Sequence, residues 1–194
     1  MSSVVGLAYE GNRDLETIKI IILRLAEDFE QDFVFSEHRR GINNAHTAIV
    51  PYVKTFTGYM FDEAEVDFAF YFTDQDDDAN SRRRQILSKI EEVGITYFEK
   101  SFVGVPIPHF EAWLICDEDI VKSVLHYDHT KPLPYSDMRP KERLQALVQN
   151  SSVNILLEDA KIQIAQRMSF ENLCRAQVGF KEFYTSFRRF FNQT

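Results

Sequence analysis

The chain is expected to adopt an α/β fold, with a mostly parallel sheet of about four strands flanked by helices and followed by a helical extension. First, apolar strand-like runs alternate with amphipathic helical segments along the first part of the 194 residues, and such alternation implies a parallel sheet with helices on both faces. Second, the remainder shows helical periodicity. We therefore expect an α/β domain over residues 1–127 and a helical extension over residues 128–194 that packs on it.

Four runs have the length and composition of strands. They are rich in branched and aromatic apolar residues and end at turn-forming or charged residues. The run that ends at Phe72 is the most aromatic, and it is expected to be buried within the sheet. The four runs cover residues 4–9, 32–36, 67–73 and 95–103.

Helices are expected between and after these strands. Asn12 is placed to cap the first, Asn80 or Ser81 the third, and Gly94 ends the third. Prolines after the last strand stop it and start a short helical segment near Glu111. The phenylalanine stripe of the last helix is expected to be core. The predicted helices begin near residue 13 and cover residues 44–56, 81–93, 117–126, 140–148, 153–168 and 169–191.

An acidic cluster follows the aromatic strand directly. Asp74, Asp76, Asp77 and Asp78 are four carboxylates in five positions. In an open α/β sheet, ligands bind at the carboxyl ends of the strands. Carboxylates packed this tightly repel one another, so they usually need a cation. Hard oxygen ligands suit Mg²⁺, which keeps several waters and bridges to substrate phosphates.

Two rival interpretations of this cluster stay open. The acids could form only an acidic turn that precedes and caps the next helix. A calcium-binding loop is the second rival, because the aspartates match its first ligand positions. The calcium pattern is broken, however, since Ala79 replaces the glycine and Gln85 replaces the closing glutamate.

Three further carboxylates are candidate site residues. Glu10 follows the first strand, and Gly11 allows a tight turn there. Asp14 falls in the first turn of the following helix. Glu111 is a carboxylate in an otherwise apolar stretch, where a charge should be exposed, paired or liganding. Each could also have an ordinary structural role, as a helix-dipole, first-turn or paired acid.

Basic residues occur near the expected site. Arg82, Arg83 and Arg84 open the helix after the acidic cluster, where they either contact phosphate or neutralise the acids. The basic turn at residues 37–41 follows the second strand and is more typical of a solvated loop. His38 and His46 lack helical ligand spacing, so no zinc site is proposed.

Net charge, cysteine spacing and the length of the apolar runs limit the classes of protein to which the chain can belong. The net charge of −8, from 22 basic and 30 acidic residues, argues against broad nucleic-acid binding by the free protein, although a local basic strip is not excluded. Cys116 and Cys174 show no metal-type spacing, which suits a reducing cytoplasm. We expect no signal peptide and no membrane span, because no apolar run approaches about 18 residues.

Three motifs in order carry a family resemblance. They are Glu10-Gly11 followed by Asp14, Asp74-x-Asp76 after a central strand, and Pro108-x-Phe110-Glu111-Ala112-Trp113-Leu114. The first two together resemble the Toprim domain of topoisomerases, bacterial primases and OLD-family nucleases. The third looks like a segment of small stand-alone Toprim-like proteins that are associated with anti-phage defence ATPases.

The resemblance implies a function and residue roles. Glu10 matches the Toprim glutamate of proton transfer and metal organisation, and Asp74 and Asp76 match the divalent-metal pair, with Asp78 as a further candidate ligand. Asp14 matches an acid that nuclease-type members place after the glutamate, and Glu111 matches more loosely. The implied protein is a Mg²⁺- or Mn²⁺-dependent nuclease acting on DNA or RNA, as an effector beside a partner ATPase, with a homo-oligomer as a further expected assembly. The alternative is a non-cleaving interaction or sensor module that binds the ATPase.

Overall fold

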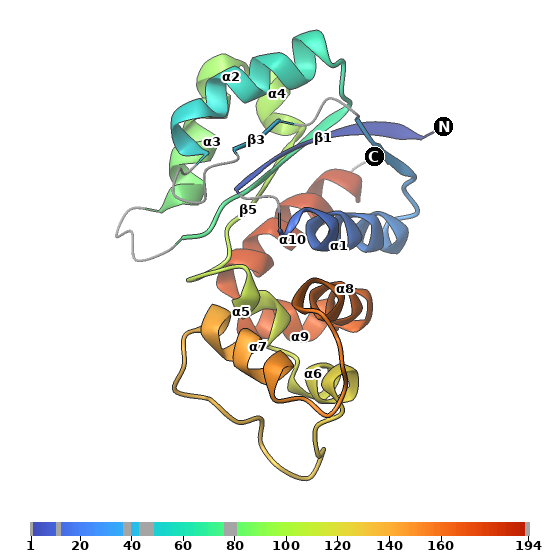
Figure 1. The fold of residues 1–194 in the computed structure, drawn as a ribbon. Helices are drawn as coiled ribbons and strands as arrows, with labels where there is room; N and C mark the ends of the chain where they lie inside the picture. Colours follow the sequence, from blue (N-terminus) through green and yellow to red (C-terminus); the bar gives the residue numbers. More distant parts are fainter. Residues whose placement is uncertain (1, 11–12, 37–39, 43–48, 76–80, 193–194) are drawn as a thin grey trace.

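The fold is built around a parallel sheet, shown in Figure 1 for the computed structural model. Strand β1 (Ser3–Glu10) pairs with β4 (Phe68–Phe72), which pairs with β5 (Ser101–Gly104). On its other side β1 pairs with β2 (Phe33–Phe35) through its first half and with β3 (Arg40–Ile42) through its second half. The order β2-β1-β4-β5, with all pairings parallel, confirms the expected α/β class. The structure describes residues 2–10, 13–36, 40–42, 49–75 and 81–192.

The two central strands are in a register that aligns their carboxyl ends. Tyr9 of β1 is opposite Phe72 of β4, so Glu10 and Thr73 are the next residues along the two strands. Alternate side chains of β4 enter opposite faces of the sheet. Phe70 and Phe72 join one apolar cluster, whereas Tyr71 belongs to the other.

One face of the sheet is covered by a group of short helices and helical turns. The longest of them, α3, is capped as expected by Ser81, whose hydroxyl accepts a hydrogen bond from the Arg84 amide at 3.3 Å. These elements and the upper face of the sheet enclose the second apolar cluster. They are the 3₁₀ turn η1 (Val50–Tyr52), α2 (Val53–Gly58), the π-helical turn η2 (Tyr59–Glu63), α3 (Arg82–Val93) and α4 (Ile95–Glu99).

Helices α1 (Leu15–Asp28) and α10 (Val178–Phe191) lie along the opposite face. Phe180, Phe183 and Phe187 of α10 are fully buried, which confirms that this stripe is core. The end of the chain thus completes the core of the sheet that begins it.

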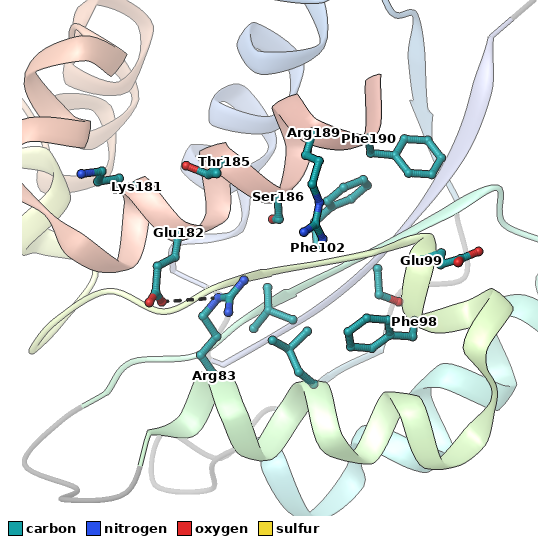
Figure 2. Close-up of a pocket in the computed structure, with 13 residues that line it drawn as sticks. Arg83, Phe98, Glu99, Phe102, Lys181, Glu182, Thr185, Ser186, Arg189 and Phe190 are labelled. Atoms are coloured by element: carbon teal, nitrogen blue, oxygen red, sulfur yellow. Dashed lines mark ion pairs between the residues drawn. The ribbon is translucent and has the colours of Figure 1, made fainter. Parts of the chain in front are cut away.

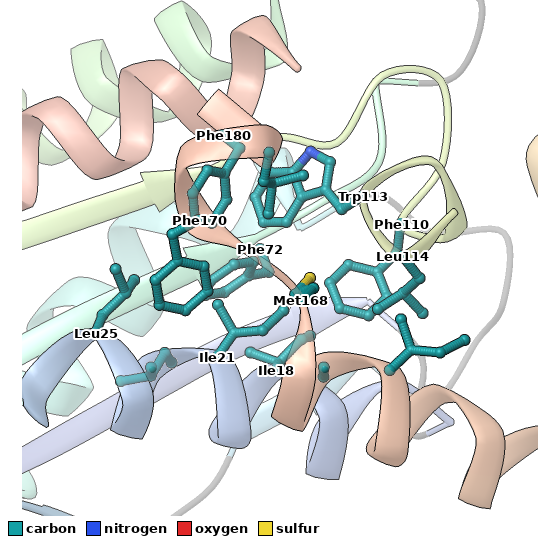
Figure 3. Packing of buried hydrophobic residues seen from close by; sticks show 14 of the residues in the cluster. Ile18, Ile21, Leu25, Phe72, Phe110, Trp113, Leu114, Met168, Phe170 and Phe180 are labelled. Atoms are coloured by element: carbon teal, nitrogen blue, oxygen red, sulfur yellow. The ribbon is translucent and has the colours of Figure 1, made fainter. Parts of the chain in front are cut away.

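A helical layer lies beside this face and joins it through one continuous core (Figure 3). Ile18 and Ile21 of α1 belong to the same buried cluster as Trp113 and Met168. Where the α/β domain ends, predicted at residue 127, stays a prediction. The helices of the layer are α5 (Glu111–Leu114), α6 (Glu118–Leu125), α7 (Pro140–Gln149), α8 (Leu157–Arg167) and α9 (Phe170–Ala176).

Some predicted boundaries were wrong. The expected strand over residues 95–103 is α4 followed by the short β5. Gly94, at φ 171°, separates α3 from α4. The Tyr97 ring stacks on Phe61 with centroids 4.8 Å apart, and this contact stabilises the helical turn that contains Tyr97. The predicted helix over 169–191 is two helices that meet at Gln177. Asn12 and Asn80, two expected caps, lie outside the described residues.

Candidate functional site

Glu10 lies at the end of β1, where three neighbours surround its carboxylate. Its Oε1 accepts hydrogen bonds from the Ile49 amide at 3.0 Å and from the Thr73 hydroxyl at 2.5 Å. The Arg82 guanidinium lies 3.6 Å from the same oxygen. Within the described residues these contacts all use Oε1. The carboxylate is therefore oriented by two donors that belong to different elements, next to a cation.

Asp74 is held beside Glu10 by the extension of the β4–β5 ladder. The Thr73 amide donates to the Gly104 carbonyl at 3.4 Å, and the Gln75 amide donates to the Pro106 carbonyl at 2.9 Å. These bonds fix the backbone on both sides of Asp74. The acid that follows the strand therefore has a defined position at the carboxyl edge of the sheet.

Arg82 connects the two strand ends. Its Nη1 donates to the Asp74 carbonyl oxygen at 2.5 Å and to the Thr73 hydroxyl at 3.3 Å, besides its approach to Glu10. The Gln75 side chain accepts a hydrogen bond from the Arg82 amide at 3.2 Å, which docks the start of α3 on this edge. Among the described residues, Arg82 contacts the Glu10 carboxylate and the Asp74 backbone, while Arg83 lies 3.5 Å from Glu182 of α10.

His109 enters the site from the segment between β5 and α5. Its Nδ1 lies 3.6 Å from Oδ2 of Asp74, so a group that can carry a proton faces this acid. His109 was not among the residues predicted from the sequence. Its only signal was its place two residues before Glu111, in the motif that carries the third resemblance.

Asp14 and Glu111 meet at a lysine rather than at Glu10. Nζ of Lys161, from α8, lies 2.8 Å from Asp14 and 2.7 Å from Glu111, and all three side chains are largely enclosed. Lys161 was not predicted from the sequence, because a lysine at a helical position is usually solvated. Whether Asp14 and Glu111 also serve catalysis stays a prediction.

Burial is the largest single influence on the pKa values of Asp14 and Lys161. It raises the pKa of Asp14 above its usual range, and this effect outweighs the opposing attraction of Lys161. Burial alone would lower the pKa of Lys161, but the two carboxylates together outweigh it and raise that pKa. The lysine is accordingly held as a cation between two acids.

The donor set at the strand ends fits a hard divalent cation. Glu10 and Asp74 are oxygen donors on adjacent strands, and Mg²⁺ is commonly held by one or two carboxylates together with waters and substrate phosphates. In the part of the chain that the structure describes, no three His, Cys, Asp or Glu side chains gather as a metal site. Asp76 and Asp78, the other predicted ligands, lie outside the described residues, as does most of the basic turn at residues 37–41.

The described helices include none that is long and apolar enough to cross a membrane. Comparison of the chain with protein-family models, curated proteins and solved structures finds no match.

Proposed function

We propose that the chain is a Mg²⁺-dependent nuclease that hydrolyses phosphodiester bonds of DNA or RNA at the carboxyl ends of β1 and β4. One observation carries the proposal: Glu10 ends β1 and Asp74 follows the neighbouring parallel strand β4 at the same edge of the sheet, where Arg82 lies 3.6 Å from the Glu10 carboxylate and donates to the Asp74 carbonyl oxygen. This is the edge at which open α/β sheets bind ligands. The resemblance to Toprim nucleases implies the same two acids.

The residues at this edge supply the groups that phosphodiester hydrolysis needs. The bound ion would neutralise phosphate charge and lower the pKa of a water. Glu10 accepts a proton from the attacking water, and Arg82 binds a non-bridging phosphate oxygen between the two acids. His109, beside Asp74, donates a proton to the leaving oxygen. Thr73 holds Glu10 in the orientation that this transfer requires.

A second candidate function is favoured by the position of Arg82. A guanidinium 3.6 Å from Glu10 neutralises an acid without any metal, as it would in a module that binds but does not cut. In this alternative the chain senses nucleic acid or metal and reports to a partner ATPase. The alternative therefore predicts no hydrolysis with any substrate, either alone or with the partner.

Delivery to nucleic acid is part of the proposal. A net charge of −8 slows the encounter with a polyanion. We expect the isolated chain to bind nucleic acid weakly and a partner ATPase or a homo-oligomer to bring it to its substrate. Nanomolar binding of random duplex DNA by the purified chain at physiological salt would contradict this expectation.

The test of the nuclease is Glu10→Gln. The amide oxygen keeps the acceptor for Ile49 and Thr73, while the charge and the basic oxygen are lost. Loss of proton transfer alone should slow cleavage of plasmid DNA and single-stranded RNA by a factor of about 10² to 10⁴. Glu91→Gln, an exposed acid on α3, is the matched control and should cut like wild type.

Thermal unfolding is measured beside the rates, so that a misfolded variant is recognised. Equal cleavage by Glu10→Gln and wild type in Mg²⁺ would rule out the nuclease site. No cleavage by wild type, alone or with a partner ATPase, would favour the binding module.

A further inference from the structure

The last strand of the sheet has an open edge. β5 pairs with β4 on one side, and among the described strands none pairs with its other side. The bonds from the Ala69 amide to the Lys100 carbonyl and from the Thr73 amide to the Gly104 carbonyl show which β5 residues face β4. Because alternate residues of a parallel strand direct their backbone groups to opposite sides, Ser101 and Val103 direct theirs to the open edge.

This edge forms the floor of a groove of about 1020 Å³ (Figure 2). Arg83 of α3 and Phe98 of α4 line one wall, and Lys181 and Arg189 of α10 line the other. The floor is recessed, since Phe102 is 2% exposed and Val103 is 1% exposed. The groove is thus a recess with backbone donors and acceptors of β5 at its base.

Helix α10 closes the edge beyond the groove. A Cβ on Gly179 would lie 1.9 Å from the Val105 carbonyl oxygen, so the helix backbone presses directly on the chain that follows β5. The Ser101 hydroxyl donates to the Tyr97 carbonyl at 2.7 Å at the other end. Only a short stretch of edge is open, which suits one strand of ordinary length.

The α10 wall carries unmatched positive charge. Arg83 is paired with Glu182, at 3.5 Å. Within the described part of the chain, Lys181 and Arg189 form no ion pair. These two cations on one wall, in a chain with a net charge of −8, favour a ligand with acidic groups on that side.

The shape and charge select among possible occupants. A second copy of the chain would bring its own α3 and α10 against those of the first before the two recessed edges met. A phosphate backbone is charged along its whole length and would also lie against Glu99, which lines the groove, whereas alternate side chains let a peptide strand place its acids on the side of Lys181 and Arg189. An extended peptide satisfies the free backbone groups and needs only the width of one strand.

We propose that the groove between α3 and α10 binds an extended, acidic segment of a partner protein, which adds to the open edge of β5 as a further strand. Side chains on one side of that segment meet Lys181 and Arg189, and those on the other side meet Leu87 and Phe98. The groove residues do not include Glu10 or Asp74, so this proposal stands apart from the proposed nuclease.

The probe is a capped, fluorescein-labelled peptide of about eight residues in which valine and glutamate alternate. Saturable binding by fluorescence anisotropy is expected, with slowed hydrogen exchange at the Ser101 and Val103 amides. The Lys181→Glu, Arg189→Glu double variant should weaken binding about tenfold or more. Lys131→Glu with Arg175→Glu makes the same charge change at exposed positions outside the groove, and this control should bind like wild type.

Two N-methylated isomers of the peptide test strand addition itself. One is methylated on its valine amides and the other on its glutamate amides, so each loses the hydrogen bonds of one edge only. Strand addition predicts that one isomer binds and the other does not. Equal behaviour of the isomers, equal binding of a valine–lysine peptide, protection elsewhere in the chain, or absence of binding would overturn the proposal. So would tighter binding of a single-stranded 20-mer DNA at the same wall.

Discussion

Lys161→Met tests whether the buried lysine holds the helical layer to the α/β core. Nζ of Lys161 lies 2.8 Å from Asp14, which precedes α1, and 2.7 Å from Glu111, which begins α5. Methionine keeps most of the volume of the side chain and removes the charge. The two enclosed carboxylates then lose the cation that lies between them.

The expected loss follows from breaking a buried ion pair. Removing one partner of a fully buried pair typically costs about 3–5 kcal/mol. The Asp14 side chain is 23% exposed, so water screens part of the charge and the low end, about 3 kcal/mol, is expected. For a chain of this size that corresponds to a fall of roughly 6–12 °C in Tm.

The pH dependence has a defined sign. Burial raises the pKa of Asp14 in the folded state, and the attraction of Lys161 opposes the rise. A carboxyl whose folded pKa is raised contributes stability that is present below its unfolded pKa and lost as pH rises through the folded pKa. Without the lysine the folded pKa of Asp14 rises further. The deficit of Lys161→Met should therefore be largest near neutral pH and shrink toward the ordinary aspartate pKa of 3.8.

Calorimetry and urea unfolding at pH 7 and pH 5 measure this deficit. Lys131→Met, at a lysine whose side chain is 78% exposed, is the control and should lie within about 0.5 kcal/mol of wild type. Glu111→Gln combined with Lys161→Met should recover about 1 kcal/mol, because one of the two charges is removed with its partner. A Lys161→Met chain that is as stable as wild type at pH 7, or a deficit that grows toward acid, would refute the reasoning.

Three further predictions concern other parts of the chain. Gly179→Ala places a Cβ 1.9 Å from the Val105 carbonyl oxygen, so α10 must shift; a loss of about 1–3 kcal/mol is expected by urea unfolding, and an unchanged midpoint would contradict it. Burial raises the pKa of Cys116 to about 12, so in a Cys174→Ser chain its thiol should react with a disulfide reagent at pH 8 far more slowly in native than in denaturing buffer; equal rates in the two buffers would contradict this. Asp74→Ala with Asp76→Ala should abolish weak Mn²⁺ binding measured by calorimetry, and equal heats for variant and wild type would contradict the metal site.

Local patterns predicted the elements that are both regular and buried. The aromatic run of β4 and the apolar stripe of α1 have unambiguous periods, and both form as expected. The segment over residues 95–99 misled the prediction, because a short apolar run fits a strand or a helix equally well. Tyr97 of this segment stacks on Phe61, and this tertiary contact stabilises the helical conformation.

The order of apolar and helical segments along the chain predicted the fold class, and Glu10 and Asp74 were predicted as candidate site residues from the sequence. Alternating strands and helices imply a parallel sheet whose carboxyl ends meet at one edge, so Glu10 and Asp74 were both expected at that edge. That their two strands are neighbours was implied by the Toprim resemblance, and the pairing of β1 with β4 confirms it. The residues that surround these two acids are known only from the folded structure. Lys161 lies 147 residues from Asp14, and nothing local marks it as buried until α8 packs on α1. In the same way β5 is an edge strand because of the strand order, and Lys181 lines its groove because α10 returns across the sheet. Pairing between distant residues depends on packing, which no short pattern encodes.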